Sequence, residues 1–389
     1  MLAKIDAESP AVTRYYFDHN ATGPVHPEVA EVFASAMRET FGNASSVHRE
    51  GQAARQRIER AREQVAAFLG CSVKEVVFTS GGTESDNLAI FGVARRTAER
   101  RHVITTAIEH PAVLNTCAQL EREGVEVTYV QPLRSGVVDP EAVRRQLRPH
   151  TVLVSVMHAN NETGVMQPVN EIGAIARNAG ILFHSDGVQA AGKVPLRLAD
   201  APIDLYSISG HKFGAPKGVG ALFVRSGVEL QPTQFGGKHE RSRRAGTENV
   251  PGIIALGAAC TVPHEQDVSA LRDRLEQGIL SRVRDATVSG AGADRLPNTS
   301  NIRFDGIEGE AVVISLDLKG FAVSSGSACS SGAVEPSHVL LAMGLTPEQA
   351  KSSVRFSLGP GNTVEQVDRL VEAVEQSVTH LRRISPVYA

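Results

Sequence analysis

The sequence has few of the features that mark secreted, disulfide-bonded or membrane proteins. Its 389 residues include only four cysteines, which are widely scattered and form no CxxC pair. This pattern fits neither a disulfide framework nor a zinc knuckle, and it predicts a reducing, cytoplasmic setting. The first residues, MLAKIDAESPAVTRYYF, carry charges and no apolar run, so a secretory signal is not expected. The longest apolar stretch, IIALGAACTV, is too short to span a bilayer.

The chain also lacks an excess of charge of either sign. Its formal net charge is -3, which gives no electrostatic reason to expect binding to nucleic acid or to an anionic membrane, because both favour basic patches. The partner is therefore expected to be a small molecule or a protein. Apolar residues are plentiful, at 42% of the chain, and can fill a sizeable core. The length predicts two domains.

Seven short apolar and β-branched runs are predicted to be strands of one sheet. Most are apolar at successive positions, as expected for strands covered on both faces. Helical patterns lie between them, so strand and helix alternate over residues 15–263. This order predicts a large α/β domain with a mainly parallel seven-stranded sheet and helices on both faces. The runs are EVVFT (75–79), HVITT (102–106), VEVTYV (125–130), TVLVSVM (151–157), ILFHSD (181–186), LYSIS (205–209) and VGALFV (219–224).

The order of elements changes after Pro263. Helices and short strands follow, and they predict a smaller α+β domain made of residues 264–389 together with residues 1–14. Its loop AVSSGSACSSGAVEPS, residues 322–337, offers nothing bulky against which Cys329 could pack. Free cysteine is usually buried, so a thiol in this loop indicates a function other than packing. The other three cysteines are predicted to fill the core: Cys71, Cys117 and Cys260.

A glycine-rich junction follows the first predicted strand, in FTSGGTESDNLAI. The strand ends at Thr79, two glycines follow, and Thr83 begins a helix with Asp86 three positions on, a pattern similar to a capping box. Such a junction presents free backbone N–H groups and the positive end of a helix, so Gly82 and Thr83 are candidates for binding phosphate. A purely structural tight turn explains the same residues equally well.

An acidic residue, Asp186, ends the predicted strand in HSDGVQAAG, at the edge where open α/β sheets bind ligands. A carboxylate buried there is costly to ionise without a positive partner, and a protonated pyridine nitrogen would supply one. Two alternatives stay open. His184 and Asp186 form an HxD pair like part of a non-haem iron site, and an aspartate at this position can simply cap a turn.

A hydroxyl, an imidazole and an amine meet at the end of the strand in SISGHKFGAPKGVG, on Ser209, His211 and Lys212. A desolvated lysine amine commonly forms Schiff bases with carbonyl cofactors. Pyridoxal phosphate needs such a lysine, a phosphate cradle and an acid for its pyridine nitrogen. Candidates for all three are present: Lys212, the junction at Gly82 and Thr83, and Asp186.

With these sites in place, the whole chain resembles a known family. From YFDHNAT near residue 16 to SVRFSLG and LRRISP near the end, it is similar to the pyridoxal-phosphate-dependent cysteine desulfurases of the NifS/IscS type, which share fold type I with the class-V aminotransferases. No single motif is specific, but the set is. The motifs are FTSGGTESDNLAI, EHPAVL, NNETG, HSDGVQAAGK, SGHKFGAPKGVG, RRAGTENV, SSGSACSSG and EPSHVL.

The resemblance implies roles around the cofactor. Lys212 would form the Schiff base, Asp186 would pair with the pyridine nitrogen, and Gln189 would bind the ring hydroxyl. His110 would stack on the pyridine ring and carry protons, and Asn161 would lie near the ring oxygen and the substrate carboxylate. The implied phosphate contacts are Gly82, Thr83, Ser209, His211 and, from the second subunit of a homodimer, Thr247.

Two further residues would act on the substrate. The resemblance implies that Arg355 of SVRFSLG clamps the substrate carboxylate, a task suited to a bidentate guanidinium. It also implies that Cys329 takes the sulfur, and a serine-glycine loop would let this thiol move between substrate and acceptor. The expected reaction converts L-cysteine into L-alanine and a persulfide on Cys329. The acceptor is expected to be a protein such as an iron-sulfur scaffold, or part of a tRNA-thiolation route.

Three alternatives to this reaction are worth separating. A C–S or selenocysteine lyase would share everything except the need for Cys329. A non-haem iron oxygenase would use the HxD pair, but it usually requires a β-barrel and leaves Lys212 without a role. A scaffold that stores sulfur on a cysteine would need no cofactor site. A visible absorbance band that is lost on borohydride treatment would separate the first alternative from the other two.

Overall fold

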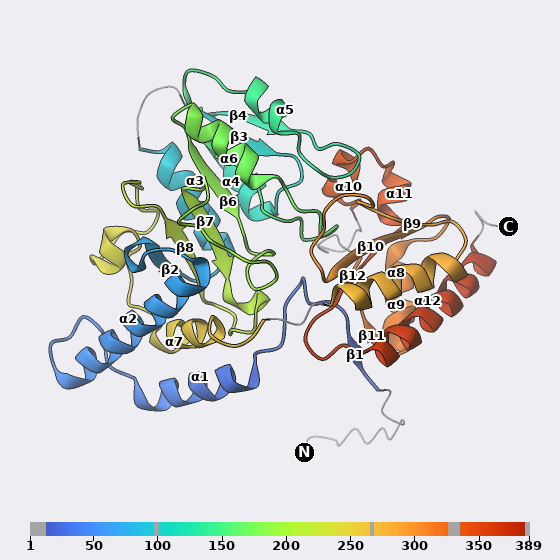
Figure 1. Cartoon of the computed structure of the whole chain (residues 1–389), viewed down its shortest axis with the longest axis horizontal. Helices are drawn as coiled ribbons and strands as arrows, with labels where there is room; N and C mark the ends of the chain where they lie inside the picture. Colours follow the sequence, from blue (N-terminus) through green and yellow to red (C-terminus); the bar gives the residue numbers. More distant parts are fainter. Residues whose placement is uncertain (1–12, 97–100, 265–267, 326–334, 386–389) are drawn as a thin grey trace, which may run out of the picture.

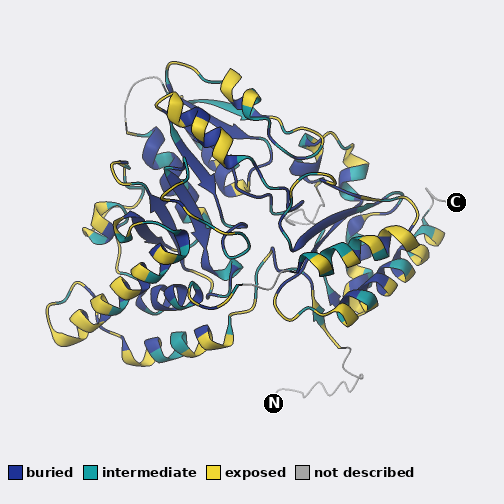
Figure 2. Cartoon of the chain, in the orientation of Figure 1, coloured by how far each residue is buried: buried dark blue, intermediate teal, exposed yellow. Residues whose placement is uncertain are grey.

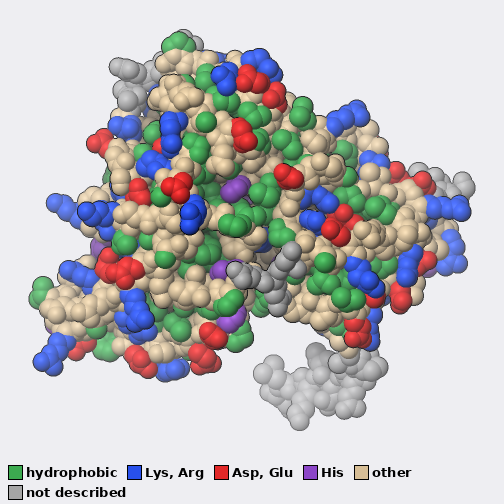
Figure 3. Space-filling model, in the orientation of Figure 1, with side chains coloured by type: hydrophobic (Ala, Val, Ile, Leu, Met, Phe, Trp, Pro, Cys, Tyr) green, Lys and Arg blue, Asp and Glu red, His purple; other side chains and the backbone are tan. Residues whose placement is uncertain are grey.

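The computed structural model describes residues 13–96, 101–264, 268–325 and 335–385. These residues form a large part around a seven-stranded sheet and, beside it, a smaller part around a three-stranded sheet (Figure 1). The strands of both sheets are mostly buried, and the outward helix faces are exposed (Figure 2). Basic and acidic side chains are interspersed over the face in view (Figure 3). None of the described helices is long and apolar enough to cross a bilayer.

The larger sheet is mainly parallel, as the alternation of strands and helices predicts. In spatial order its strands are β2 (Val76–Thr79), β8 (Gly220–Val224), β7 (Leu205–Ser209), β6 (Leu182–Asp186), β5 (Thr151–Ser155), β3 (His102–Thr106) and β4 (Glu126–Val130). The five strands from β7 to β4 run parallel, whereas β8 is antiparallel to both of its neighbours. Each predicted run forms one of these strands, so the predicted sheet is confirmed.

Helices cover both faces of this sheet. Side chains alternate across a strand, so that Val77 of β2 faces one core while Val76 and Phe78 face the other. The core around Val77 is shared with α3 (Gly82–Ala94) and α4 (Pro111–Arg122). The opposite core is shared with α1 (Pro27–Glu39), α2 (Arg49–Leu69), α5 (Pro140–Arg145), α6 (Val169–Asn178) and α7 (Val250–Ala259). Continuous apolar runs are therefore buried on both sides.

The smaller part has the predicted α+β character. Its antiparallel sheet has the order β12 (Ser353–Ser357), β10 (Thr299–Phe304) and β9 (Ala286–Val288). Three helices share its core: α8 (Ser269–Arg282), α9 (Gly309–Leu318) and α12 (Val364–Ile384). The short helices α10 (His338–Ala342) and α11 (Pro347–Lys351) contribute instead to the core of the larger part.

The N-terminal segment joins the two parts. β1 (Tyr15–Tyr16) pairs in parallel with β11 (Phe321–Ala322), and Phe17 lies in the core of the smaller part. The chain then crosses to the larger part, where α1 packs against α7. The domain division at 15–263 stays a prediction, and this pairing favours a boundary just after Phe17 over one at residue 15. The next residues, 18–22, therefore lie at the junction of the two parts.

Candidate active site

Lys212 lies in the short helix η2 (Gly210–Lys212), directly after β7. This position puts its amine at the carboxyl end of the parallel strands, the edge at which such sheets bind ligands. The amine donates hydrogen bonds to two backbone carbonyl oxygens, that of Asn20 at 2.5 Å and that of Ala21 at 2.8 Å. The N-terminal segment thus holds the amine in place from the other side of the junction.

The surroundings of Lys212 make its amine easier to deprotonate. Burial disfavours the ammonium, and the positive charge of Arg355 adds to this effect, while Asp186 and Asp18 partly oppose it. The pKa of Lys212 falls from 10.5 to about 8. Near pH 7 roughly a tenth of the amine is therefore unprotonated, the form that a nucleophile or a proton acceptor needs.

Asp186 ends β6 and is buried. Its Oδ1 accepts a hydrogen bond of 2.9 Å from the backbone N–H of Val188. Burial raises the pKa of Asp186, whereas that hydrogen bond and the positive charges of His110 and Lys212 favour the ionised form. Burial and the charge of Asp186 raise the pKa of nearby Asp86 well above its usual range. A cation placed against Asp186 would relieve this cost, as the protonated pyridine nitrogen is expected to do.

His110 caps the N-terminus of α4. Its Nδ1 accepts a hydrogen bond of 3.1 Å from the backbone N–H of Ala112, which fixes the plane of the ring. Burial lowers the pKa of His110, the charge of Asp186 raises it, and the charges of Lys212 and His338 lower it further. The structure therefore brings His110 into the electrostatic neighbourhood of both Lys212 and Asp186, and its stacking on the cofactor ring stays a prediction.

The junction between β2 and α3 is built around glycines. Gly81 has a φ of 151°, a backbone conformation that favours glycine, and a Cβ there would lie 3.4 Å from Ser209 Oγ. A Cβ on Gly82 would lie 2.7 Å from a methyl group of Val188. Gly82 is the first residue of α3, and Thr83 beside it is exposed. The helix end is thus close to the ends of β6 and β7, with free N–H groups available to an anion.

The remaining candidates for phosphate contacts divide into two groups. Ser209 is buried at the end of β7. His211 comes two positions later, and its Nδ1 lies 3.1 Å from Thr22 Oγ1. Burial and the charges of Lys212 and Lys217 lower the pKa of His211 to about 4. Thr247 is exposed, and no hydrogen bond among the described residues links it to this cluster. Its contact with a second subunit stays a prediction.

Arg355, on β12, brings the smaller part into the site. Its Nη2 donates to Asp18 Oδ1 at 2.7 Å, and its Nη1 donates to the backbone carbonyl of Asn161 at 3.1 Å. Arg355 is buried, and its Nε has no hydrogen-bond partner among the described residues. The backbone of Asn161 thus lies beside the guanidinium, while its expected position near the ring oxygen and the substrate carboxylate stays a prediction. A buried guanidinium with an unused donor is suited to receiving a carboxylate.

The loop that contains Cys329 begins next to Arg355, whose backbone forms two hydrogen bonds with that of Ser324. Cys329 itself lies outside the described residues, so its position stays a prediction. The other three cysteines pack in or against the cores, as predicted. Burial raises the pKa of Cys71 and of Cys117 to about 12 and that of Cys260 still further, so none of these thiols is a ready nucleophile.

Two residues of the site have no assigned role in the sequence analysis. Asn20 accepts hydrogen bonds at its backbone carbonyl from Lys212 and, at 3.0 Å, from Nε2 of Gln189. Lys193 donates to the side chains of both Asn20 and Gln189. Both residues lie within motifs that carry the family resemblance, YFDHNAT and HSDGVQAAGK. Membership in these motifs is the sequence feature that could have pointed to them as site residues. Their meeting depends on contacts between residues more than 160 positions apart.

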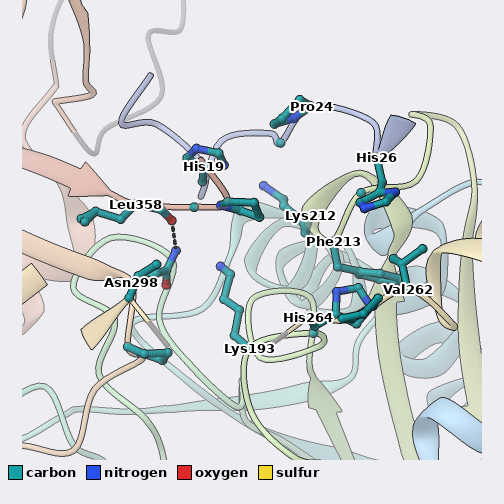
Figure 4. A pocket seen from close by; sticks show the side chains of 18 of the residues that line it. His19, Pro24, His26, Lys193, Lys212, Phe213, Val262, His264, Asn298 and Leu358 are labelled. Atoms are coloured by element: carbon teal, nitrogen blue, oxygen red, sulfur yellow. Dashed lines mark hydrogen bonds between the residues drawn. The ribbon is translucent and has the colours of Figure 1, made fainter. Parts of the chain in front are cut away.

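A cavity of about 940 Å³ opens beside Lys212. Lys193 and Lys212 reach into it from the larger part, and Asn298 and Leu358 line it from the smaller part (Figure 4). His19, from the N-terminal segment, lies above the two amines in this view. This cavity lies at the junction between the two parts. Of the predicted site residues only Lys212 lines it, so it reaches the amine without including Asp186, His110 or Arg355.

The geometry disfavours the iron alternative. Both nitrogens of His184 have hydroxyl partners, Ser155 Oγ at 2.8 Å and Ser207 Oγ at 3.0 Å. Burial lowers the pKa of His184 to about 3, so a neutral ring makes these contacts. No group of three metal-ligating side chains gathers in the part of the chain that the structure describes, and the fold is α/β instead of the β-barrel that such oxygenases usually require.

Comparisons with known proteins match nearly the whole chain. The family model described as aminotransferase class-V matches residues 15–370. A protein of Trichormus azollae named cysteine desulfurase is 49% identical over 377 residues, 95% of this chain and 94% of the relative. A solved NifS-like protein superposes with a TM-score of 0.89 at 38% identity, over 95% of this chain and all of that one. A structure titled SspA in complex with cysteine gives a TM-score of 0.82 at 38% identity, over 90% of this chain and 100% of that one.

The match covers the residues that form both parts of the molecule, so it is not limited to the sheet. Relatives of this family depend on pyridoxal phosphate, the cofactor that the sequence motifs predict. From the matched length and the level of identity, the chain belongs to the class-V aminotransferase family and, within it, to the cysteine desulfurases.

Proposed function

We propose that this chain uses pyridoxal phosphate to convert L-cysteine into L-alanine while transferring the sulfur to Cys329 as a persulfide. The observation that carries the proposal is the position of the Lys212 amine. Its pKa is lowered to about 8, and it is held at the end of the sheet between the charges of Asp186 and Arg355. Such an amine is suited to bind a carbonyl cofactor and to take a proton from the substrate.

The residues present fit the cofactor. The glycine junction at the start of α3 leaves room beside Ser209 that side chains would fill, and its free N–H groups suit a phosphate. Asp186 needs a cation, and a protonated pyridine nitrogen is one. We infer that Gly82, Thr83, Ser209 and His211 hold the phosphate, that His110 covers the ring, and that Gln189 contacts its hydroxyl. When bound, pyridoxal phosphate supplies an electron sink that stabilises negative charge at the substrate Cα.

Each side chain then has a task that its surroundings support. Arg355 binds the substrate carboxylate through its unused Nε and its neighbouring Nη donors, and this orients the Cα–H bond. Lys212 accepts the Cα proton as an uncharged amine. Burial lowers the pKa of His110, so its ring can accept a proton from the thiol and pass that proton to the solvent. Asp186 keeps the proton on the ring nitrogen by its negative charge.

Cys329 supplies the soft nucleophile that Lys212, Asp186 and Arg355 do not provide. Its thiolate attacks the sulfur of the substrate, so that an S–S bond forms and the Cβ–S bond breaks, and the bonding pair passes to the carbon skeleton that becomes alanine. An unperturbed thiol has a pKa of about 8.5, so removal of its proton by a base such as His110 assists the step near neutral pH. A lyase without this nucleophile would release sulfide directly.

The experiment that tests the proposed function is a product balance. Purified protein loaded with pyridoxal phosphate and given L-cysteine without reductant is expected to form one alanine for each protein-bound persulfide in the first turnover. With a thiol reductant, alanine and sulfide are expected in equal amounts. Formation of pyruvate and ammonia in place of alanine would support the lyase alternative instead.

The sulfur acceptor and the assembly state are finer proposals. An iron-sulfur scaffold protein or a tRNA-thiolation partner in the cytoplasm is the expected acceptor. A homodimer is expected because RRAGTENV would complete the phosphate site of a second subunit through Thr247. Large apolar side chains such as Phe41, Val47 and Phe235 are about four-fifths exposed or more, in keeping with a partner surface. Light scattering that finds a cofactor-loaded monomer would contradict the dimer.

The lowered pKa of Lys212 predicts how cofactor binding depends on pH. Only the uncharged amine reacts with an aldehyde, so the rate at which cofactor-free protein takes up pyridoxal phosphate is expected to rise about tenfold per pH unit up to about pH 8 and then to level off. A lysine with the usual pKa would keep rising to about pH 10.4. Stopped-flow absorbance between pH 6 and 10 measures this, and a rise that continues past pH 9.5 would contradict the perturbed amine.

A further inference from the structure

Lys193 lies in the turns that follow β6, and its side chain reaches into the same cavity as Lys212 (Figure 4). The proposed reaction gives it no task. Its amine donates hydrogen bonds of 2.9 Å to the side-chain oxygen of Gln189 and of 2.9 Å to the side-chain oxygen of Asn20. A lysine directed at two polar partners inside the site, and not toward solvent, calls for a physical reason.

The two acceptors of Lys193 are also joined to each other. Nε2 of Gln189 donates at 3.0 Å to the backbone carbonyl of Asn20. This is the same oxygen that receives the amine of Lys212 at 2.5 Å. Lys193, Gln189 and Asn20 therefore form a closed ring of three hydrogen bonds. The backbone carbonyl of Asn20, a member of this ring, also accepts from Lys212.

Lys193 and the Asn20 carbonyl together fix which way the amide of Gln189 points. An amide carries an acceptor at one end and donors at the other, whereas a lysine ammonium can only donate. Because Lys193 donates to Gln189 Oε1, the Nε2 group must point toward the Asn20 carbonyl. If Lys193 lost its donors, Gln189 Oε1 would lose its partner, and only the contact with the Asn20 carbonyl would still hold the amide in place.

Asn20 extends the ring to the smaller part of the molecule. Its side-chain oxygen also accepts a hydrogen bond of 3.1 Å from Asn298 Nδ2, and its own Nδ2 donates at 2.8 Å to Thr299 Oγ1. Asn298 and Thr299 lie at the start of β10. Lys193 thus connects the strand-end loop of the larger part, the N-terminal segment and the smaller part at a single point.

The surroundings of Lys193 make a positive charge on its amine less favourable than it is in water. Burial and the positive charges of Lys212 and Arg355 lower the pKa of Lys193 well below its usual range. In either protonation state the amine has enough N–H donors for both of its acceptors, Gln189 Oε1 and Asn20 Oδ1. A permanent positive charge here would repel the neighbouring Lys212 ammonium.

We propose that Lys193 is a positioning residue for Lys212, which orients Gln189 and Asn20 so that the Asn20 carbonyl holds the Lys212 amine where the cofactor aldehyde arrives. The inference rests on the proposed function, because it assumes that Lys212 binds pyridoxal phosphate. It predicts an effect on the free amine of Lys212, in the cofactor-free protein and whenever the amine is released during turnover.

The test compares three variants of the full chain. Lys193→Met keeps the approximate length of the side chain and removes its donors, whereas Lys193→Arg keeps donors. Lys217→Met makes the same change at an exposed lysine five positions from Lys212. The probe is pyridoxal phosphate added to cofactor-free protein, followed by the visible absorbance of the lysine-bound cofactor. Lys193→Met is expected to slow this uptake about tenfold, the effect of losing a hydrogen bond of roughly 1 to 1.5 kcal/mol. Lys217→Met is expected to match the wild type, and Lys193→Arg to recover most of the rate.

A second readout separates positioning from general damage. In the loaded enzyme, Lys193→Met is expected to lower kcat about tenfold and to leave KM for L-cysteine within about threefold, since Arg355 keeps its partners. Uptake by Lys193→Met at the wild-type rate would overturn the proposal, as would equal slowing in the Met and Arg variants. The uptake measurement does not use L-cysteine, so it stands even if the product balance were to reject desulfuration.

Discussion

Replacement of Lys212 by alanine is expected to reduce the formation of alanine from L-cysteine by at least about a thousandfold. The variant loses the amine that binds the cofactor and the group that accepts the Cα proton. Loss of a proton-transfer group alone typically costs roughly 10²- to 10⁴-fold in rate. The fold is expected to survive, because the amine contacts only backbone carbonyls at the junction, those of Asn20 and Ala21.

The matched control is Lys217→Ala, a substitution at an exposed lysine in the same motif. It is expected to keep wild-type turnover and the visible absorbance of bound cofactor. Borohydride reduction followed by peptide mapping is expected to place the pyridoxyl group on Lys212 in the wild type and in this control. A label on Lys193 or Lys217 in the wild type would refute the assignment, and so would a Lys212→Ala variant that keeps a tenth of the wild-type rate.

Replacement of Cys329 by alanine is expected to stop sulfide release and persulfide formation while the protein still binds pyridoxal phosphate and L-cysteine. Lys212, Asp186 and Arg355 can bind the amino acid and loosen its Cα–H bond, but none of them is a soft nucleophile. The expected loss in kcat is on the order of a thousandfold or more, as for other catalytic nucleophiles. Serine is not expected to restore the rate, because a hydroxyl is a far weaker nucleophile than a thiolate near neutral pH.

The control for this experiment is Cys71→Ala. Cys71 is only partly buried, but its pKa is raised to about 12 and it packs against the larger core, so its loss is expected to leave turnover unchanged. Cofactor absorbance and the spectral change on adding L-cysteine report binding in every variant. If Cys329→Ala turned over L-cysteine at close to the wild-type rate, a C–S lyase would replace the desulfurase as the function of this chain.

Much of the fold could be predicted because its signals are local. Each of the seven strands is a short apolar run whose burial on both faces follows from its composition. The helices between most of them favour parallel pairing, from which β8 departs. The same logic located Asp186 and Lys212, since a polar residue directly after a buried parallel strand must lie at the ligand-binding edge of the sheet. The resemblance of the motifs to one family then supplied the cofactor and the reaction.

Only the tertiary structure decided how the N-terminal segment takes part. Nothing in the local sequence around Tyr15 shows that β1 pairs with β11, some 300 residues away, or that Asp18 binds Arg355 across 337 positions. Such contacts depend on how two finished parts of the molecule pack, and a short polar stretch carries no periodic signal for them. The lowered pKa of Lys212 has the same origin, because burial and the charge of Arg355 exist only after the parts come together. The sequence by itself predicts which residues carry the chemistry, and the packing of the two parts determines the positions and charges with which they meet.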